Sequence, residues 1–165
     1  MIRLLMLLFV TGTIATSCSH TYYIVRHAEK DQAEGNDPAL SEAGKVRAIV
    51  LRDELKPKHI RYIYSTATVR ARSTAMPLSE ATSVPITVYA STDSLVVQLK
   101  QIRKGNVLIV GHSNTVDDIV NKLCDETKIA KDLSETQFDN LFIVKFKGKK
   151  VSFTKKKYGY PSNPE

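Results

Sequence analysis

The feature of this sequence that most constrains the fold is an alternation of short β-branched runs with longer segments of helical periodicity. The short runs predict strands at 21–26, 61–65, 86–89 and 107–110. Apolar residues spaced three or four apart predict helices at 41–55, 68–80, 95–102 and 116–123. Pro77 should kink or end the second helix, because proline has no backbone N–H. This alternation predicts an α/β fold, a three-layer α/β/α sandwich around a mostly parallel sheet.

The end of the chain departs from this alternation. Segments 141–146 and 151–154 predict an antiparallel hairpin that turns near Gly148. An irregular, proline-containing tail follows at 159–165. The length of the chain fits one domain, which we place at 21–158.

The first residues have the layout of an export signal. Arg3 is followed by an apolar run at 4–10 and by small residues at 15–17, directly before Cys18. The apolar run is too short to span a bilayer as a helix. Small residues before a cysteine resemble the bacterial lipobox, in which that cysteine carries lipid and becomes the mature N-terminus, although Ala15 stands where the lipobox usually has leucine.

We therefore expect residues 1–17 to be a signal peptide and residues 18–20, including His20, to be a lipid-anchored tether. The expected location is the bacterial cell envelope, as a periplasm-facing lipoprotein, or outside the cell as a secreted protein. The membrane contact would be the lipid on Cys18. The other cysteine, Cys124, is expected to be a small buried hydrophobic residue.

The net charge of +7 is concentrated near the C-terminus. Seven lysines fall within thirteen residues: Lys145, Lys147, Lys149, Lys150, Lys155, Lys156 and Lys157. Such a cluster can bind nucleic acid or an anionic membrane, and it can also protect an exposed edge strand from pairing with another chain. We favour edge protection, and we expect no nucleic acid partner.

Two histidines directly follow predicted strands, namely His27 after 21–26 and His112 after 107–111. The carboxyl ends of parallel strands are where α/β sheets bind ligands. Arg26 precedes His27, and Arg70 and Arg72 lie just inside the helix after the second strand, where we expect only one of the two to face the pocket. Guanidinium groups hold phosphate oxygens in paired hydrogen bonds, so a phosphate dianion is the expected ligand.

Four motifs together resemble those of the histidine phosphatase superfamily. They occur in the family's order at 24–29 (IVRHAE), 40–44 (LSEAG), 64–66 with 70–75 (YST, RARSTA), and 110–113 (VGHS). The resemblance implies a phosphoglycerate mutase-like fold. The short chain resembles the small phosphohistidine-phosphatase-like branch.

The resemblance implies that His27 is the nucleophile, that Arg26 and Arg70 bind the phosphoryl group, and that His112 is a second donor to its oxygens. It implies a phosphatase acting on a phosphomonoester or a phosphohistidine, of a small molecule or of a phosphoprotein, through a phosphohistidine intermediate. This scheme needs no metal and no cofactor, and the sequence has no cluster with metal-ligand spacing.

The general acid is the departure from the family pattern. Ser113 stands where one branch of the family has an aspartate, and the stretch where another branch has a glutamate offers only Asp93. Glu29 is a second candidate. If neither carboxyl serves, the substrate should have a good leaving group, such as the imidazole of phosphohistidine.

Two other functions stay open. A phosphate-binding or interaction module with weak catalysis could keep the same pocket. A serine hydrolase would use Ser113 in 111–115 (GHSNT), which lacks the second glycine of a nucleophile elbow.

Overall fold

The computed structural model describes residues 19–32 and 35–162. The strands are β1 (Ser19–Arg26), β2 (Ile60–Ser65), β3 (Ile86–Val88), β4 (Asn106–Gly111), β5 (Asn140–Lys147) and β6 (Lys150–Lys157). The helices are α1 (Glu42–Leu55), α2 (Val69–Thr82), α3 (Thr92–Gln101) and α4 (Val116–Cys124), with a short 3-10 turn, η1 (Lys56–Lys58), after α1.

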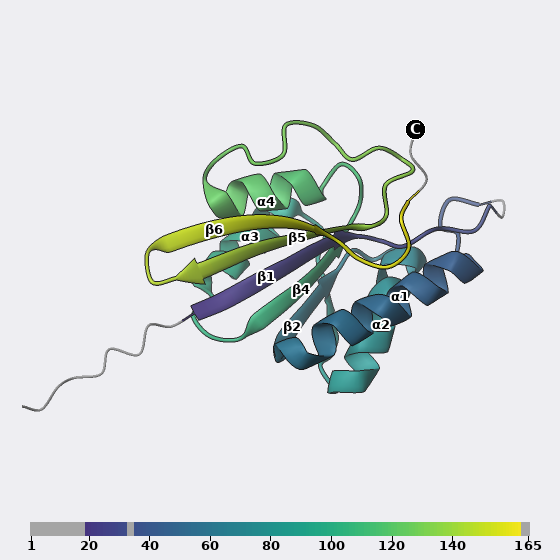
Figure 1. The fold of residues 1–165 in the computed structure, drawn as a ribbon, viewed down its shortest axis with the longest axis horizontal. Coiled ribbons are helices and arrows are strands. Elements are labelled where there is room, and N and C mark those ends of the chain that lie inside the picture. Colours follow the sequence, from purple (N-terminus) through teal and green to yellow (C-terminus); the bar gives the residue numbers. More distant parts are fainter. Residues whose placement is uncertain (1–18, 33–34, 163–165) are drawn as a thin grey trace, which may run out of the picture.

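The strands form one mixed sheet in the order β3-β2-β4-β1-β5-β6. The first four of these run parallel, and β5 and β6 form an antiparallel hairpin on the β1 side. Helices α1 and α2 cover one face, and α3 and α4 cover the other (Figure 1). The predicted three-layer α/β/α sandwich with a C-terminal hairpin is confirmed.

The central strand β1 shows why the sequence folds this way. Its residues alternate between two cores, with Tyr22 and Ile24 in the core under α3 and α4, and Tyr23 and Val25 in the core under α1 and α2. Strands buried on both faces need continuous apolar runs, which explains the strong strand signal of β1 and β4.

The strand β1 begins two residues earlier than predicted. Ser19 pairs with Lys147 of β5, and His20 is buried with its ring stacked 5.1 Å from that of Phe146. The assignment of Ser19 and His20 to a tether is therefore wrong. The predicted signal peptide and Cys18 lie outside the described residues.

The helix α2 does not end at Pro77 and continues to Thr82. Ala71, Ala75 and Leu78 are buried against the sheet on both sides of the proline. This packing outweighs the one hydrogen bond that proline removes. The helix predicted at 68–80 is therefore present, and of the two effects expected at Pro77, a kink or an end, the end does not occur.

The segment between β1 and α1 is held closely against the start of α1. Ser41 caps the helix by accepting a hydrogen bond from the Gly44 N–H, and its own N–H donates to the Glu29 carbonyl at 3.0 Å. A Cβ at position 44 would overlap the same carbonyl oxygen, so this close approach requires glycine. The contact fixes the chain that follows His27.

The remaining structural expectations concern Cys124 and the membrane. Cys124 is half-buried against the core under α3 and α4, and this burial raises the pKa of its thiol. Among the described residues, no helix is both long enough and apolar enough to cross a bilayer.

Candidate active site

The two histidines singled out from the sequence leave the sheet side by side. Arg26 lies opposite Gly111 in the parallel pairing of β1 with β4, and the His27 N–H donates to the Gly111 carbonyl at 2.9 Å. The two imidazole rings, of His27 and His112, have their centres 5.2 Å apart. The adjacent strand ends therefore bring both rings to one pocket.

The His27 ring is held in one tautomer. Its Nδ1 lies 2.8 Å from the Ala28 carbonyl oxygen, so Nδ1 carries the proton and donates. Its Nε2 accepts a hydrogen bond from Arg70 Nε at 3.2 Å. Burial, together with the nearby Arg26 charge, lowers the pKa of His27 to about 3. The ring is therefore neutral, with the lone pair on Nε2.

Arg26 is a buried charge beside this ring, with 2% of its side chain exposed. It donates to the Ser134 carbonyl at 2.7 Å and to a Glu135 carboxylate oxygen at 2.8 Å. Its guanidinium carbon lies 4.3 Å from the centre of the Phe138 ring. Within the described part of the chain its Nε has no hydrogen-bond partner, which leaves a donor for a ligand.

Arg70 reaches the same pocket from the first turn of α2. Asp37 accepts from the Val69 N–H at 2.9 Å and pairs with Arg70 at 3.2 Å, so it fixes both the helix start and the guanidinium. Arg72, two residues on, is exposed and does not line the pocket. Of these two arginines only Arg70 lines the pocket, which agrees with the role that the resemblance implies for it.

The second histidine, His112, is fixed by two threonines. Its Nε2 lies 2.9 Å from the Thr66 hydroxyl, and its backbone N–H donates to the Thr115 hydroxyl at 2.9 Å. Burial, together with Arg70 and Arg26, lowers the pKa of His112. The contact with Thr66 explains why the turn after β2 carries a threonine.

These side chains open into one cavity of about 410 Å³, the His27 pocket. It is lined by Arg26, His27, Lys30, Arg70, His112, Ser113, Asn114, Asp132 and Glu135. All four residues predicted to bind or attack phosphorus line it. Among the described residues, no group of three or more His, Cys, Asp or Glu side chains could hold a metal ion.

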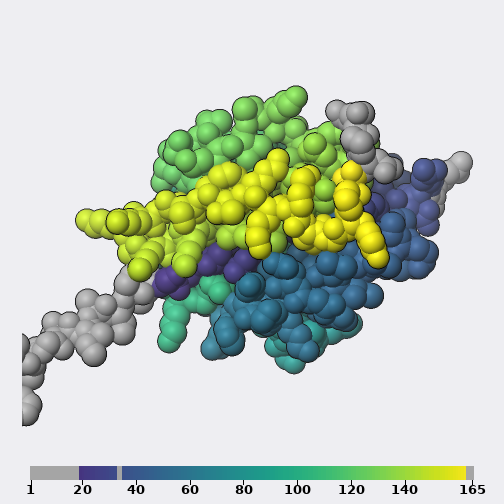
Figure 2. Space-filling view, viewed as in Figure 1, coloured from purple at the N-terminus to yellow at the C-terminus, as the bar shows by residue number. Residues whose placement is uncertain are grey.

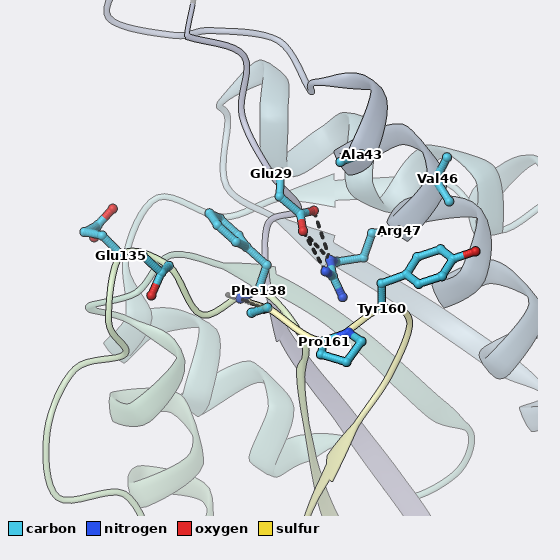
Figure 3. Close-up of a pocket in the computed structure, with 10 residues that line it drawn as sticks. Glu29, Ala43, Val46, Arg47, Glu135, Phe138, Tyr160 and Pro161 are labelled. Atoms are coloured by element: carbon cyan, nitrogen blue, oxygen red, sulfur yellow. Dashed lines mark hydrogen bonds and ion pairs between the residues drawn. The ribbon is translucent and has the colours of Figure 1, made fainter. Parts of the chain in front are cut away.

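Neither candidate general acid lines the His27 pocket. Asp93, at the start of α3, pairs with Lys122 at 2.8 Å and is largely exposed. Glu29 is turned toward α1, where Arg47 holds both of its carboxylate oxygens (Figure 3). The two carboxyls are engaged elsewhere because a lysine and a buried arginine attract them, so their assignment to the site is corrected.

The carboxylate that does enter the pocket is Glu135, which the sequence reasoning missed. It accepts from the Ser113 hydroxyl at 2.8 Å as well as from Arg26, and these contacts lower the pKa of its carboxyl. It lies in the irregular segment between α4 and β5, where no periodicity or motif marks it. As an ionised group, Glu135 is poorly suited to donate a proton. It also pairs with the guanidinium of Arg26, which an anionic ligand would need.

A second cavity, the Phe138 pocket, adjoins the first and has a volume of about 560 Å³. Its apolar lining comes from Ala43, Val46, Phe138, Tyr160 and Pro161, with the Glu29–Arg47 pair at its base (Figure 3). Glu135 lines both pockets. A molecule larger than a phosphate could therefore extend from the His27 pocket across this surface.

The architecture matches that of several solved structures. The protein histidine phosphatase SixA, solved with tungstate, aligns with a TM-score of 0.68 and 16% identity over 83% of this chain and 96% of that chain. A mycobacterial glucosyl-3-phosphoglycerate phosphatase, solved with inorganic phosphate, aligns with a TM-score of 0.59 and 17% identity over 75% of this chain and 88% of that chain. Phosphoglycerate mutase from Bacillus anthracis aligns with a TM-score of 0.61 and 15% identity over 84% of this chain and 92% of that chain. No curated protein sequence matches the chain.

The sequence comparison agrees with these alignments. Residues 22–95 match the model of the histidine phosphatase superfamily, branch 1. The fold is that of the aligned phosphatase and phosphoglycerate mutase structures. The matched segment includes Arg26, His27 and Arg70, whereas His112 and Glu135 lie beyond it.

The Glu135 carboxylate should weaken the binding of an anion in the His27 pocket. In a Glu135→Gln protein, inorganic phosphate should bind about three- to tenfold more tightly, because it no longer competes with an ionised partner for Arg26. Isothermal titration calorimetry measures the change. Asp132→Asn, which removes the same charge from the pocket lining without a contact to Arg26, is the matched control. Weaker phosphate binding in Glu135→Gln would instead mean that Glu135 positions Arg26.

The buried neutral His27 should make stability depend on pH. Its folded-state pKa of about 3 lies below the unfolded value of 6.5, so the unfolded chain takes up the proton first as the pH falls. Stability is therefore present above pH 6.5 and lost progressively toward pH 3. Between pH 7 and pH 5 the loss from this group is about 2 kcal/mol.

Urea unfolding at both pH values measures this effect. A His27→Gln protein has no group to titrate at this position, so its stability should fall less between pH 7 and pH 5. An equal fall in both proteins would contradict a buried neutral imidazole at position 27.

Proposed function

We propose that this protein is a histidine-type phosphatase that transfers a phosphoryl group to His27 and then to water. The observation that carries the proposal is the arrangement at His27 Nε2, an unprotonated ring nitrogen beside Arg26, Arg70 and His112. A nucleophile surrounded by fixed positive charge suits attack on the phosphorus of a phosphate dianion.

The reaction proceeds in two displacements. The His27 Nε2 lone pair forms a bond to phosphorus as the bond to the leaving group breaks, and Arg70 moves its hydrogen bond from Nε2 to a phosphoryl oxygen. Arg26 and His112 donate to the other oxygens. Water then attacks phosphorus, which releases inorganic phosphate and restores the neutral imidazole. No step of this scheme requires a metal ion.

The lining of the His27 pocket favours substrates with good leaving groups. Its one carboxylate in contact with Arg26, Glu135, is held ionised, and Asp93 and Glu29 are engaged elsewhere. Phosphohistidine on a protein fits this requirement, because imidazole leaves without help from a strong acid. The open mouth and the adjoining Phe138 pocket leave room for the polypeptide around such a residue.

The contacts of Ser113 do not favour a serine hydrolase. Its hydroxyl donates to Glu135, and the nearby His112 ring nitrogen contacts Thr66 instead. A serine nucleophile needs a base that accepts its proton, and a carboxylate already held by Arg26 is a poor one.

A phosphoenzyme assay tests the proposed function. The protein should acquire acid-labile, base-stable phosphate on His27 from phosphohistidine, and His27→Ala should acquire none.

Arg70→Ala should lower kcat about 10²- to 10³-fold through loss of charge at the transition state, and Arg72→Ala should not. Hydrolysis of phosphohistidine, aryl phosphate, sugar phosphate and nucleotide is compared in parallel. If the protein binds phosphate but forms no phosphoenzyme from any of these donors, it is a phosphate-binding module and not a phosphatase.

We also propose that Cys18 carries lipid and tethers the protein to the bacterial cell envelope. The support is the signal-like segment before Cys18 and the start of the folded domain at Ser19, directly after it. A tether this short would hold the domain close to the bilayer.

Membrane fractionation tests the anchor. After a wash with high salt, which removes proteins held by charge alone, the wild-type protein should stay with the membranes. Cys18→Ala should be released, and Cys124→Ala, the matched control, should stay. Retention of Cys18→Ala would count against lipidation.

A further inference from the structure

The end of the sheet opposite the His27 pocket gathers positive charge. Strands β1, β2 and β4 all begin there, and the β5–β6 hairpin turns there, because Ser19 pairs with Lys147 and Ile60 with Asn106. Six exposed cations from three separate segments lie at this end, which we name the basic pole: Lys58, Arg61, Lys104, Lys147, Lys149 and Lys150. Figure 1 shows the hairpin turn beside the start of β1, and Figure 2 shows the hairpin projecting at this end.

The charges of the basic pole are not neutralised within the described part of the protein. No salt bridge there involves any of the six cations. Carboxylates at nearby helix ends already have partners, since Asp53 pairs with Arg52 and Asp125 with Lys100. The pole therefore presents a net positive surface to whatever lies against it.

Protection of the edge strand explains only part of this surface. That explanation accounts for lysines along β6, which is an edge of the sheet. It does not account for Lys104, because the strand that follows it, β4, lies between β2 and β1. Arg61 lies in the first part of β2, which has no strand partner on the β3 side, but it is far from β6 in the strand order. Both cations lie at the amino end of the parallel strands, outside the β5–β6 hairpin.

An exposed aromatic residue lies among the cations. Tyr62 is 41% exposed and shares a shallow hollow with Ser19, Arg61 and Lys104. Tyrosine beside lysine and arginine is the composition that proteins present to the headgroup region of a bilayer, where the ring meets acyl chains and the hydroxyl meets water.

We infer that the basic pole docks onto an anionic lipid surface. The choice over nucleic acid rests on the proposed lipid anchor, because Cys18 directly precedes Ser19, which lies within the pole. Lysines near a membrane surface contribute individually to binding and lose their effect as salt screens them. In this orientation the His27 pocket, at the carboxyl ends of β1 and β4, faces away from the bilayer. The inference does not depend on the proposed catalytic activity.

Vesicle binding of the full-length chain tests the inference, with Cys18→Ala present throughout so that no lipid is attached. Binding to vesicles of phosphatidylglycerol with phosphatidylcholine is compared with binding to vesicles of phosphatidylcholine alone. Binding to phosphatidylcholine alone measures the contribution of the predicted signal peptide. Lys149→Glu with Lys150→Glu should weaken binding to the anionic vesicles about thirtyfold or more, which corresponds to about 1 kcal/mol for each lysine.

The matched control is Lys155→Glu with Lys156→Glu, which makes the same charge change farther along β6. It should retain most of the preference for anionic vesicles, and both variants should keep the wild-type circular dichroism spectrum. Equal losses in the two variants, or no loss in either, would overturn the inference. So would tighter binding of a short single-stranded RNA than of anionic vesicles at the same salt concentration, because the pole would then suit nucleic acid.

Tryptophan fluorescence tests the orientation separately. The wild-type protein contains no tryptophan, so a single introduced tryptophan reports on its own position. Tyr62→Trp places one at the basic pole, and Tyr160→Trp places one beside the Phe138 pocket at the other end. Brominated anionic vesicles should quench the tryptophan at position 62 and leave the one at position 160 unaffected. Equal quenching at both positions, or quenching of position 160 alone, would contradict docking through the pole.

Discussion

The parallel pairing of β1 with β4 is the contact on which the candidate site depends. It places Arg26 opposite Gly111, so that His27 and His112 follow adjacent strand ends at the same level. The hydrogen bond from the His27 N–H to the Gly111 carbonyl continues the ladder beyond the strand. Because both faces of β1 are buried, a slip of one residue would exchange the side chains of its two cores. Core packing thus fixes the distance between the two imidazoles.

The second constraint is the burial of positive charge beside a neutral imidazole. Arg26 and His27 are almost fully buried, and desolvation together with the guanidinium charge keeps a proton off His27. The same guanidinium requires an anionic partner, and Glu135 supplies it. In the proposed function, the charges that bind phosphate are therefore also those that keep the attacking lone pair available.

The sequence predicts those parts of the site that depend on local pattern. The runs of β1 and β4 are apolar because both faces of these strands are buried, and the residues directly after them are fixed as soon as the strands are recognised. The pattern of α2 offered Arg70 and Arg72, and the resemblance to the histidine phosphatase superfamily selected Arg70. These features carry a signal within a few residues, so one sequence is sufficient to find them.

Contacts between distant segments could not be predicted in this way. Glu135 reaches Arg26 across 109 positions from an irregular segment, and the turning of Glu29 toward Arg47 depends on how α1 packs. His20 extends β1 by pairing with Phe146 of β5, against which its ring also stacks. Pro77 is tolerated because the residues around it are buried against the sheet. Each of these outcomes was decided by tertiary packing, which local propensity does not describe.

The polarity of the parallel sheet gives its two ends opposite electrostatic character. Helices α2 and α4 begin at the end with the His27 pocket, where their N-termini favour anions, and the helices end near the basic pole, where their C-termini favour cations. Some basic residues at that end, such as Lys58 after α1, fit this helix-end role. Lys147, Lys149 and Lys150 do not, because they lie on a hairpin that terminates no helix. Their repulsion in a small area is unfavourable for the isolated domain, and an anionic surface next to the start of β1 would relieve it.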